Sequence, residues 1–191
     1  MKKHSKRLSF LFLALIMSSF VFSCSSISSI PSPVKNKMKR GRVVKVLDGD
    51  DVLLENNVRV RLIGIDAPET YPGKKNEPYT EIARTALENL ILGKEIYVEY
   101  GDERKDVYNR NLVYAYLPES KNLDEMRNVT YNGFLFLNAY LVKMGHAVPR
   151  RYSTRNNRYE LLLFKQLKDA QQYNRGIWAE KWDEERYRST N

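Results

Sequence analysis

Three charged residues suited to chemistry on a phosphodiester occur in the order Arg61, Glu69 and Arg110. Such a substrate is an anion, and the negative charge that grows in its transition state can be stabilised by arginine side chains. A carboxylate such as that of Glu69 can orient or deprotonate an attacking water molecule. Singly, each residue also fits an ordinary role, because strand arginines usually face solvent and Glu69 could cap a helix. Their combination indicates hydrolysis of a phosphate ester.

Two aspartates lie close to these residues in the sequence. Asp50 belongs to an Asp-Gly-Asp turn, and Asp66 follows a segment with the pattern of a strand. Carboxylates with backbone carbonyls beside them are ligands that Ca²⁺ accepts in loose geometry. An Asp-Gly-Asp sequence is more often only a turn. The hypothesis is therefore a calcium site formed where two loops leave a rigid sheet.

The rest of the chain predicts the elements that would position these residues. Five segments have the branched or alternating residues of strands: 41–48, 52–55, 58–65, 94–100 and 112–117. Three segments have apolar residues at helical spacing: 78–92, 134–144 and 157–173. The polar stretch 118–130 is interpreted as an extended hairpin or loop. Together these elements predict an α+β fold, a five-stranded OB-type β-barrel with about three helices, the first inserted after the third strand.

Three sequence blocks carry a resemblance to a known family. They are V-L-D-G-D-D-V, V-R-L-I-G-I-D-A-P-E-T and D-V-Y-N-R-N-L-V-Y, with weaker matches at P-Y-T-E-I-A-R and N-R-G-I-W. In this order they resemble the staphylococcal nuclease, or thermonuclease-like, family from about Arg42 to Trp182. The resemblance implies a calcium-dependent phosphodiesterase that hydrolyses DNA or RNA and leaves 3′-phosphate ends. Whether it cuts within strands or from their ends stays open.

The resemblance also implies a role for each matching residue. Asp50, Asp66 and the backbone carbonyl of Ala67 would hold one Ca²⁺ ion. Glu69 would be the general base, and Arg61 and Arg110 would bind the phosphate in the transition state. The two remaining matches are substrate contacts: Tyr108 for a nucleotide phosphate and Tyr152 for a stacked base.

Three positions depart from the family pattern. Asp51 replaces the usual threonine and adds negative charge beside the metal site. Val107 replaces a common basic residue, which removes one possible substrate contact. Asn109 replaces a glycine, and asparagine tolerates the positive φ that such a turn requires.

The N-terminal region has the features of an export signal. Residues 1–23 combine a basic start with an apolar core at 8–22 that is too short to span a bilayer. Residues 21–24 resemble a bacterial lipobox, in which Cys24 is lipidated, although ordinary cleavage nearby is the alternative. The expected organisation is a flexible basic tether at 24–40, a nuclease-like domain at 41–182 and a charged tail at 183–191. We expect a monomer held at the cell envelope by a lipid anchor, or otherwise secreted.

Composition narrows the possible functions. The net charge of +9 falls to about +5 without the predicted signal, which suits a phosphate backbone but does not require one. One cysteine excludes a disulfide within the folded part, and His146 is the only histidine outside the signal, which excludes chemistry needing two histidines. Two other functions stay open: a nucleic-acid-binding barrel without catalysis, and an envelope lipoprotein with a structural role. The presence of all three charged residues favours the enzyme.

Overall fold

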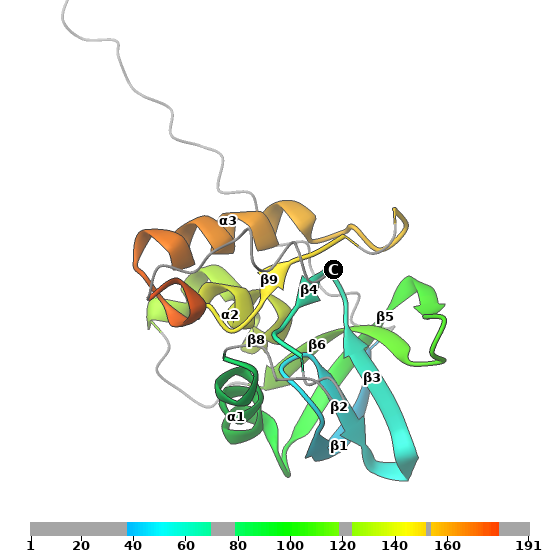
Figure 1. The fold of residues 1–191 in the computed structure, drawn as a ribbon. Coiled ribbons are helices and arrows are strands. Elements are labelled where there is room, and N and C mark those ends of the chain that lie inside the picture. Colours follow the sequence, from blue (N-terminus) through cyan, green and yellow to red (C-terminus); the bar gives the residue numbers. More distant parts are fainter. Residues whose placement is uncertain (1–37, 70–78, 119–123, 152–153, 180–191) are drawn as a thin grey trace, which may run out of the picture.

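The computed structural model describes residues 38–69, 79–118, 124–151 and 154–179, and its elements are shown in Figure 1. The strands are β1 Met38–Val46, β2 Asp51–Leu54, β3 Val58–Leu62, β4 Ile65–Asp66, β5 Glu95–Lys105, β6 Asn111–Pro118, β7 Thr130–Tyr131, β8 Phe134–Phe136 and β9 Val148–Pro149. The α-helices are α1 Thr80–Ile91, α2 Leu137–Lys143 and α3 Glu160–Gln172. Short 3₁₀ helices occupy Glu55–Asn57, Asp124–Val129 and Gly176–Trp178.

Five strands close into a ring. Their order is β3-β2-β1-β5-β6, and a parallel pairing of β3 with β6 joins the two ends. In Figure 1 these strands curl together, with α1 beside β1 and with α2 lying beneath α3. This arrangement confirms the predicted five-stranded barrel, three helices and insertion of a helix between the third barrel strand and β5.

Apolar residues at alternate positions form the barrel interior. Its fully buried members come from all five strands: Val43, Val52, Val60, Ile96, Val98 and Val113. Helix α1 packs on the barrel with Ala83, Leu87 and Ile91, a predicted stripe at spacing four. The branched side chains therefore favour the extended strand backbone and also fill the core.

The predicted third strand is interrupted at Gly64. Its φ of 77° lies in the left-handed region, which breaks the extended backbone after Leu62. The chain then forms β4, which pairs with β9 instead of continuing along the barrel. Asp66 is thus the last residue of a strand, not the first residue of a loop as predicted.

The predicted helix at 134–144 starts too early. Residues Phe134–Phe136 form strand β8 and pair with β6, so α2 begins only at Leu137. Helical spacing of apolar residues also occurs where a strand is buried on both faces, and Phe136 is fully buried. The start of α2 was therefore wrong by three residues.

Asn138 of α2 fastens the interrupted strand to the barrel. Its amide nitrogen donates to the Ile63 carbonyl at 2.9 Å, and its amide oxygen accepts from the Ala115 N–H at 3.0 Å. Both bonds are buried, so they satisfy backbone groups that the break leaves without strand partners. The two hydrogen bonds of Asn138 thus fix the end of β3 and the start of β4 close to Asp50 and Asp66.

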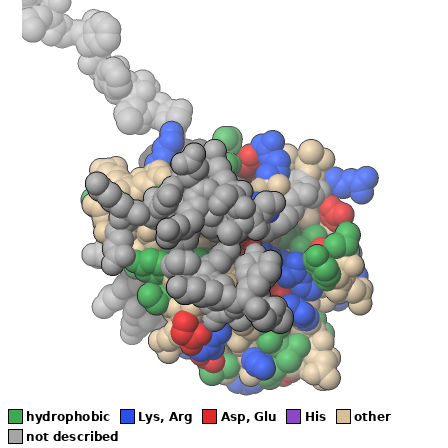
Figure 2. All heavy atoms as spheres, in the orientation of Figure 1, with side chains coloured by type: hydrophobic (Ala, Val, Ile, Leu, Met, Phe, Trp, Pro, Cys, Tyr) green, Lys and Arg blue, Asp and Glu red, His purple; other side chains and the backbone are tan. Residues whose placement is uncertain are grey.

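The described surface is of mixed charge. Figure 2 shows lysine and arginine side chains on the visible face with acidic and apolar ones among them. Among the described helices, none is long and apolar enough to cross a membrane. The predicted signal, most of the tether with Cys24, and the charged tail lie outside the described residues.

Candidate active site

The register of β2 and β3 brings the first aspartates next to Arg61. Asp51 lies directly opposite Arg61 in the antiparallel pair, and the Asp50 carbonyl accepts from the Leu62 N–H at 2.8 Å. The turn before Asp50 must come close to the chain after β4, because a Cβ on Gly49 would lie 2.5 Å from the Cβ of Ala67. Glycine is needed there for this close approach.

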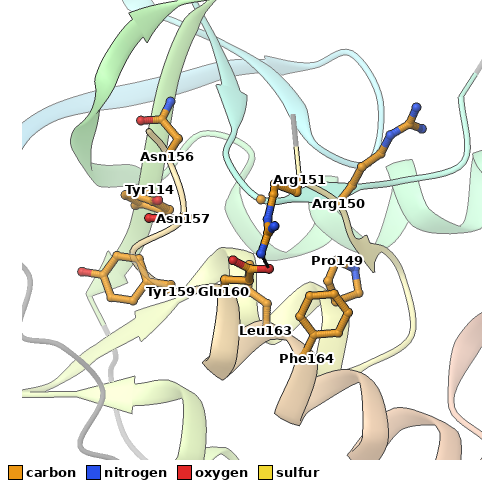
Figure 3. A pocket seen from close by; sticks show the side chains of 11 residues that line it. Tyr114, Pro149, Arg150, Arg151, Asn156, Asn157, Tyr159, Glu160, Leu163 and Phe164 are labelled. Atoms are coloured by element: carbon orange, nitrogen blue, oxygen red, sulfur yellow. Dashed lines mark hydrogen bonds and ion pairs between the residues drawn. The ribbon is translucent and has the colours of Figure 1, made fainter. Parts of the chain in front are cut away.

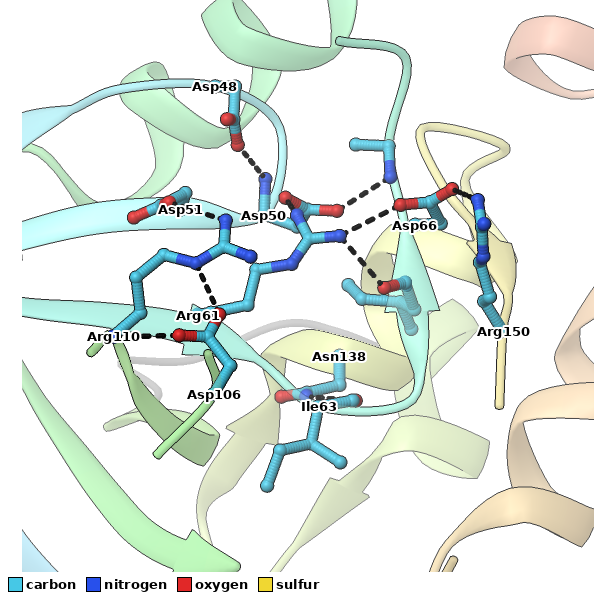
Figure 4. A network of polar contacts seen from close by, with 12 residues as sticks. Asp48, Asp50, Asp51, Arg61, Ile63, Asp66, Asp106, Arg110, Asn138 and Arg150 are labelled. Carbon is cyan, nitrogen blue, oxygen red and sulfur yellow. Dashed lines mark hydrogen bonds and ion pairs between the residues drawn. The ribbon is translucent and has the colours of Figure 1, made fainter. Parts of the chain in front are cut away.

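Arg61 joins the two predicted metal-binding carboxylates. Its Nη1 forms an ion pair with Asp50 Oδ1, and its Nη2 donates to Asp66 Oδ1 at 2.8 Å (Figure 4). All three side chains are 5% exposed or less. Charge-assisted bonds of this kind, made away from water, hold a side chain more firmly than surface pairs do. The structure therefore brings together Asp50 from the turn before β2, Arg61 from β3 and Asp66 from β4.

Each remaining oxygen of these carboxylates also accepts a hydrogen bond. Asp50 Oδ2 accepts from the Ala67 N–H at 2.6 Å, and Asp66 Oδ2 accepts from Arg150 Nη1 at 2.6 Å. Ala67 thus contacts the site through its N–H, while the prediction concerned its carbonyl. Arg150 is an arginine of this site that the sequence did not reveal.

The donor set fits calcium. Asp50 and Asp66 supply carboxylate oxygens that converge on one guanidinium. Hard oxygen donors without nitrogen or sulfur are what Ca²⁺ prefers. Among the described residues, no group of three or more acidic, histidine or cysteine side chains could hold a metal. A calcium ion here would thus rely on these two carboxylates together with carbonyl or water oxygens.

Arg110 reaches the same region from the turn before β6. Its Nε donates to Asp106 Oδ2 at 2.6 Å, and its Nη1 donates to Asp51 Oδ2 at 3.1 Å. Asn109 has a φ of 63°, so the asparagine adopts the positive φ expected for it. Because Asp51 is adjacent to Asp50, both predicted arginines lie against consecutive aspartates (Figure 4).

Asp51 has a further partner in Arg59. The Arg59 Nη2 lies 2.6 Å from Asp51 Oδ2, and its Nε lies 2.9 Å from Oδ1. Bonding to Asp51 is the main cause that raises the pKa of Arg59. The added negative charge of Asp51 is therefore paired within the protein.

The nearby arginines and burial also shift the pKa values of two neighbouring carboxyls, those of Asp48 and Asp106. Burial raises the pKa of Asp48, and the nearby guanidinium of Arg61 offsets this only in part. Burial also acts on Asp106, but the hydrogen bonds and charge of Arg110 outweigh it and hold the pKa of Asp106 below its usual range. Burial thus dominates the pKa shift of Asp48, whereas the hydrogen bonds and charge of Arg110 together outweigh burial at Asp106.

Glu69 lies three residues beyond Asp66, at the end of a described segment. Its backbone carbonyl accepts from Thr80 Oγ1 at 3.0 Å, which ties this loop to the first turn of α1. Glu69 is half-buried. The structure thus places the predicted general base on the strand exit that also carries Asp66 and Ala67.

Of the two predicted substrate tyrosines, the structure describes Tyr108. Tyr108 is 76% exposed at the tip between β5 and β6, and its ring lies 5.4 Å from the Arg110 guanidinium carbon. Tyr152 lies outside the described residues. Val107 next to Tyr108 is 92% exposed, so this position presents an apolar side chain to solvent.

A small pocket adjoins the cluster between β9 and the start of α3 (Figure 3). Arg151 points into it towards Glu160 and pairs with that carboxylate, whereas Arg150 points away. Arg150 thus contributes to the wall of the pocket but directs its guanidinium to Asp66. The pocket and the aspartate cluster are separate features that share this residue.

The comparison with protein families decides the classification. The model described as "Staphylococcal nuclease homologue" matches residues 59–180, which is more than half of the chain and includes Arg61, Asp66, Glu69 and Arg110. The chain belongs to the staphylococcal nuclease family.

Relatives within this family include proteins from several bacteria. "Thermonuclease" from Staphylococcus intermedius is 34% identical over 140 residues, covering 71% of this chain and 74% of the relative. "Micrococcal nuclease" from Shigella flexneri is 32% identical over 146 residues, covering 74% of each chain. An "Uncharacterized endonuclease" from Escherichia coli is 31% identical over 144 residues, covering 73% of this chain and 77% of the relative.

Sequence reasoning missed four members of this staphylococcal nuclease site: Asp48, Arg59, Asp106 and Arg150. Asp106 had a local signal, because it begins a turn and accepts from the N–H groups of Tyr108 and Arg110 at 3.0 and 2.9 Å. Arg150 had none, since it reaches Asp66 across 84 positions of sequence through the β4–β9 pair.

Proposed function

We propose that this chain is a calcium-dependent nuclease that hydrolyses phosphodiester bonds of DNA or RNA and leaves 3′-phosphate ends. Membership of the staphylococcal nuclease family supports the activity. The observation that carries the proposal is the convergence of two buried carboxylates on Arg61, with Arg110 bound to the adjacent aspartate. Whether cleavage is internal or terminal is left to experiment.

The metal would be held by Asp50, Asp66 and the carbonyl of Ala67. When bound, calcium supplies positive charge that stabilises the negative charge developing on the phosphate. In the structure Arg61 bridges the two carboxylates. Neutralisation of these carboxylates by a second cation would allow Arg61 to donate N–H groups to the substrate phosphate instead.

Glu69 would accept the proton of the attacking water. Arg61 and Arg110 would donate hydrogen bonds to the oxygens of the phosphate, which carry more charge in the transition state than in the ground state. Asp106 and Asp51 anchor the Arg110 guanidinium, so Arg110 requires little reorganisation when the charge develops. Tyr108 would contact a neighbouring phosphate, and Tyr152 would stack on a base.

Calcium dependence of cleavage tests this proposal. Purified residues 35–191 should degrade single-stranded DNA with calcium, stop with a chelator and resume when calcium is restored. End-labelled products should resist ligation until the 3′-phosphate is removed. Binding of DNA without cleavage would instead support the alternative of a catalytically weak binding barrel. Cleavage that continues in excess chelator would exclude the calcium mechanism.

We further propose that the chain is exported, lipidated at Cys24 and anchored to the membrane as a monomer. The basic and apolar order of residues 1–23 and the lipobox-like residues before Cys24 support this. Metabolic labelling with a fatty acid should mark the full-length protein, and Cys24→Ser should abolish the label. Labelling that persists in Cys24→Ser would exclude this anchor.

A further inference from the structure

Asp51 is a carboxylate shared by two arginines. It is fully buried, and its Oδ2 lies 2.6 Å from Arg59 Nη2 and 3.1 Å from Arg110 Nη1. Arg59 belongs to β3, and Arg110 belongs to the turn before β6, the strand that pairs with β3. A buried carboxylate is costly unless it is well paired, so its position requires both partners.

The contacts of Arg110 are distributed unevenly over its guanidinium. Asp106 holds Nε and Asp51 holds Nη1, at 2.6 and 3.1 Å. Among the described residues, no hydrogen bond reaches Nη2. The group is planar and rigid, so two fixed nitrogens determine the direction of the third.

We propose that Asp51 is a positioning residue that, together with Asp106, fixes the Arg110 guanidinium so that its Nη2 edge binds the substrate phosphate. This inference rests on the proposed nuclease function. Asp51 itself does not touch the substrate and acts only through Arg110. Asp51 thus becomes part of the site, although its negative charge would by itself oppose an anionic substrate.

Arg59 makes this arrangement electrostatically possible. Two carboxylates on Arg110 alone would give a net negative group beside the bound phosphate. Arg59 returns the group of Asp51, Asp106, Arg59 and Arg110 to neutrality. The Arg59 side chain is 49% exposed, whereas the Asp51 side chain is not exposed. The negative charge of Asp51, which would repel a phosphate, is therefore buried.

Kinetics of Asp51→Asn provide the first test. With Asn, Arg110 keeps its contact to Asp106 but loses its second charged anchor, so kcat should fall on the order of 10- to 100-fold. KM should change by less than about threefold, because Arg61 and Arg110 still present their positive charges to the phosphate. Arg59→Gln in the Asp51→Asn background should cause no further loss, since Arg59 acts through Asp51. Additive losses would overturn the role given to Arg59.

Asp169→Asn is a matched control. Asp169 is also shared by two cations, at 2.6 Å from Lys143 Nζ and 2.8 Å from Arg175 Nη1, but it belongs to α3. This variant should lower the melting temperature without changing kcat. If Asp51→Asn does not fold, the pair Asp51→Thr with Arg59→Thr removes both charges and should show the same loss of kcat.

A measurement independent of cleavage separates failure of this inference from failure of the proposed function. The Nε–H signal of Arg110, assigned by its loss in Arg110→Lys, should exchange slowly with water in the wild type and faster in Asp51→Asn. An unchanged exchange rate, or an unchanged kcat in an active enzyme, would overturn the positioning role. A wild type that lacks cleavage but shows the exchange difference would overturn only the nuclease proposal.

Discussion

Replacing Glu69 by Gln should lower kcat on single-stranded DNA by on the order of 10²- to 10⁴-fold. Glutamine has the same shape but cannot accept the proton of the attacking water. The hydrogen bond from Thr80 that ties this loop to α1 is accepted by the Glu69 backbone carbonyl, so the substitution leaves it in place. The melting temperature should therefore stay close to that of the wild type. Initial rates at saturating calcium and thermal unfolding measure the two effects.

Glu88→Gln is the matched control for this substitution. Glu88 lies on α1 and pairs with Arg84 at 2.7 Å, away from the aspartate cluster. It should leave kcat unchanged, because its carboxylate has no part in the reaction. Full activity of Glu69→Gln would exclude Glu69 as the base and leave water activation to another group.

Arg61→Gln should produce the largest loss of stability. It leaves Asp50 and Asp66 buried without the cation that joins them, and breaking such a pair costs about 3–5 kcal/mol. Calcium should recover more stability in this variant than in the wild type, since the two carboxylates have lost the guanidinium that joins them, although Asp66 keeps its ion pair with Arg150. A ligand that binds only the folded state raises the melting temperature in this way. Thermal unfolding with calcium and with chelator measures the difference.

Arg84→Gln controls for the loss of an arginine as such. Arg84 pairs with Glu81 and Glu88 on the surface of α1, where solvent screens the charges. It should change neither the stability appreciably nor the response to calcium. An Arg61→Gln protein whose melting temperature is indifferent to calcium would argue against a metal at Asp50 and Asp66.

The barrel could be predicted from the sequence because its signals are local. Branched residues alternate along β1, β2 and β5, and glycine, aspartate or asparagine mark the turns between strands. The proximity of Asp50 to Arg61 also follows from local structure, since a short antiparallel pair connects β2 to β3. Asp66 follows four residues after Leu62 and is reached through one turn.

Other parts depend on contacts that the local sequence does not encode. Leu161 and Phe164 belong to the apolar residues at helical spacing in 157–173, but they are 87% and 45% exposed. The buried face of α3 instead carries Leu163, Gln166 and Ala170, because its orientation is set by packing on α2. The pairing of Asp51 with Arg59 was missed for a different reason: Asp51 was considered only as a charge beside the metal site, and the register of β2 and β3 was not predicted.

The parallel pairing of β3 with β6 has a consequence for the order of events during folding. Arg61 lies within this pair, and Arg110 immediately precedes it. Contacts between segments so far apart in sequence form late, because closing a long loop costs entropy before the contact compensates it. In a chain whose helices and hairpins have formed but whose β3 and β6 are not yet paired, Arg61 and Arg110 would not yet lie in one assembled site. Recovery of cleavage during refolding would then trail recovery of helical structure, and a newly made or translocating chain would be harmless to nucleic acid until the ring closes.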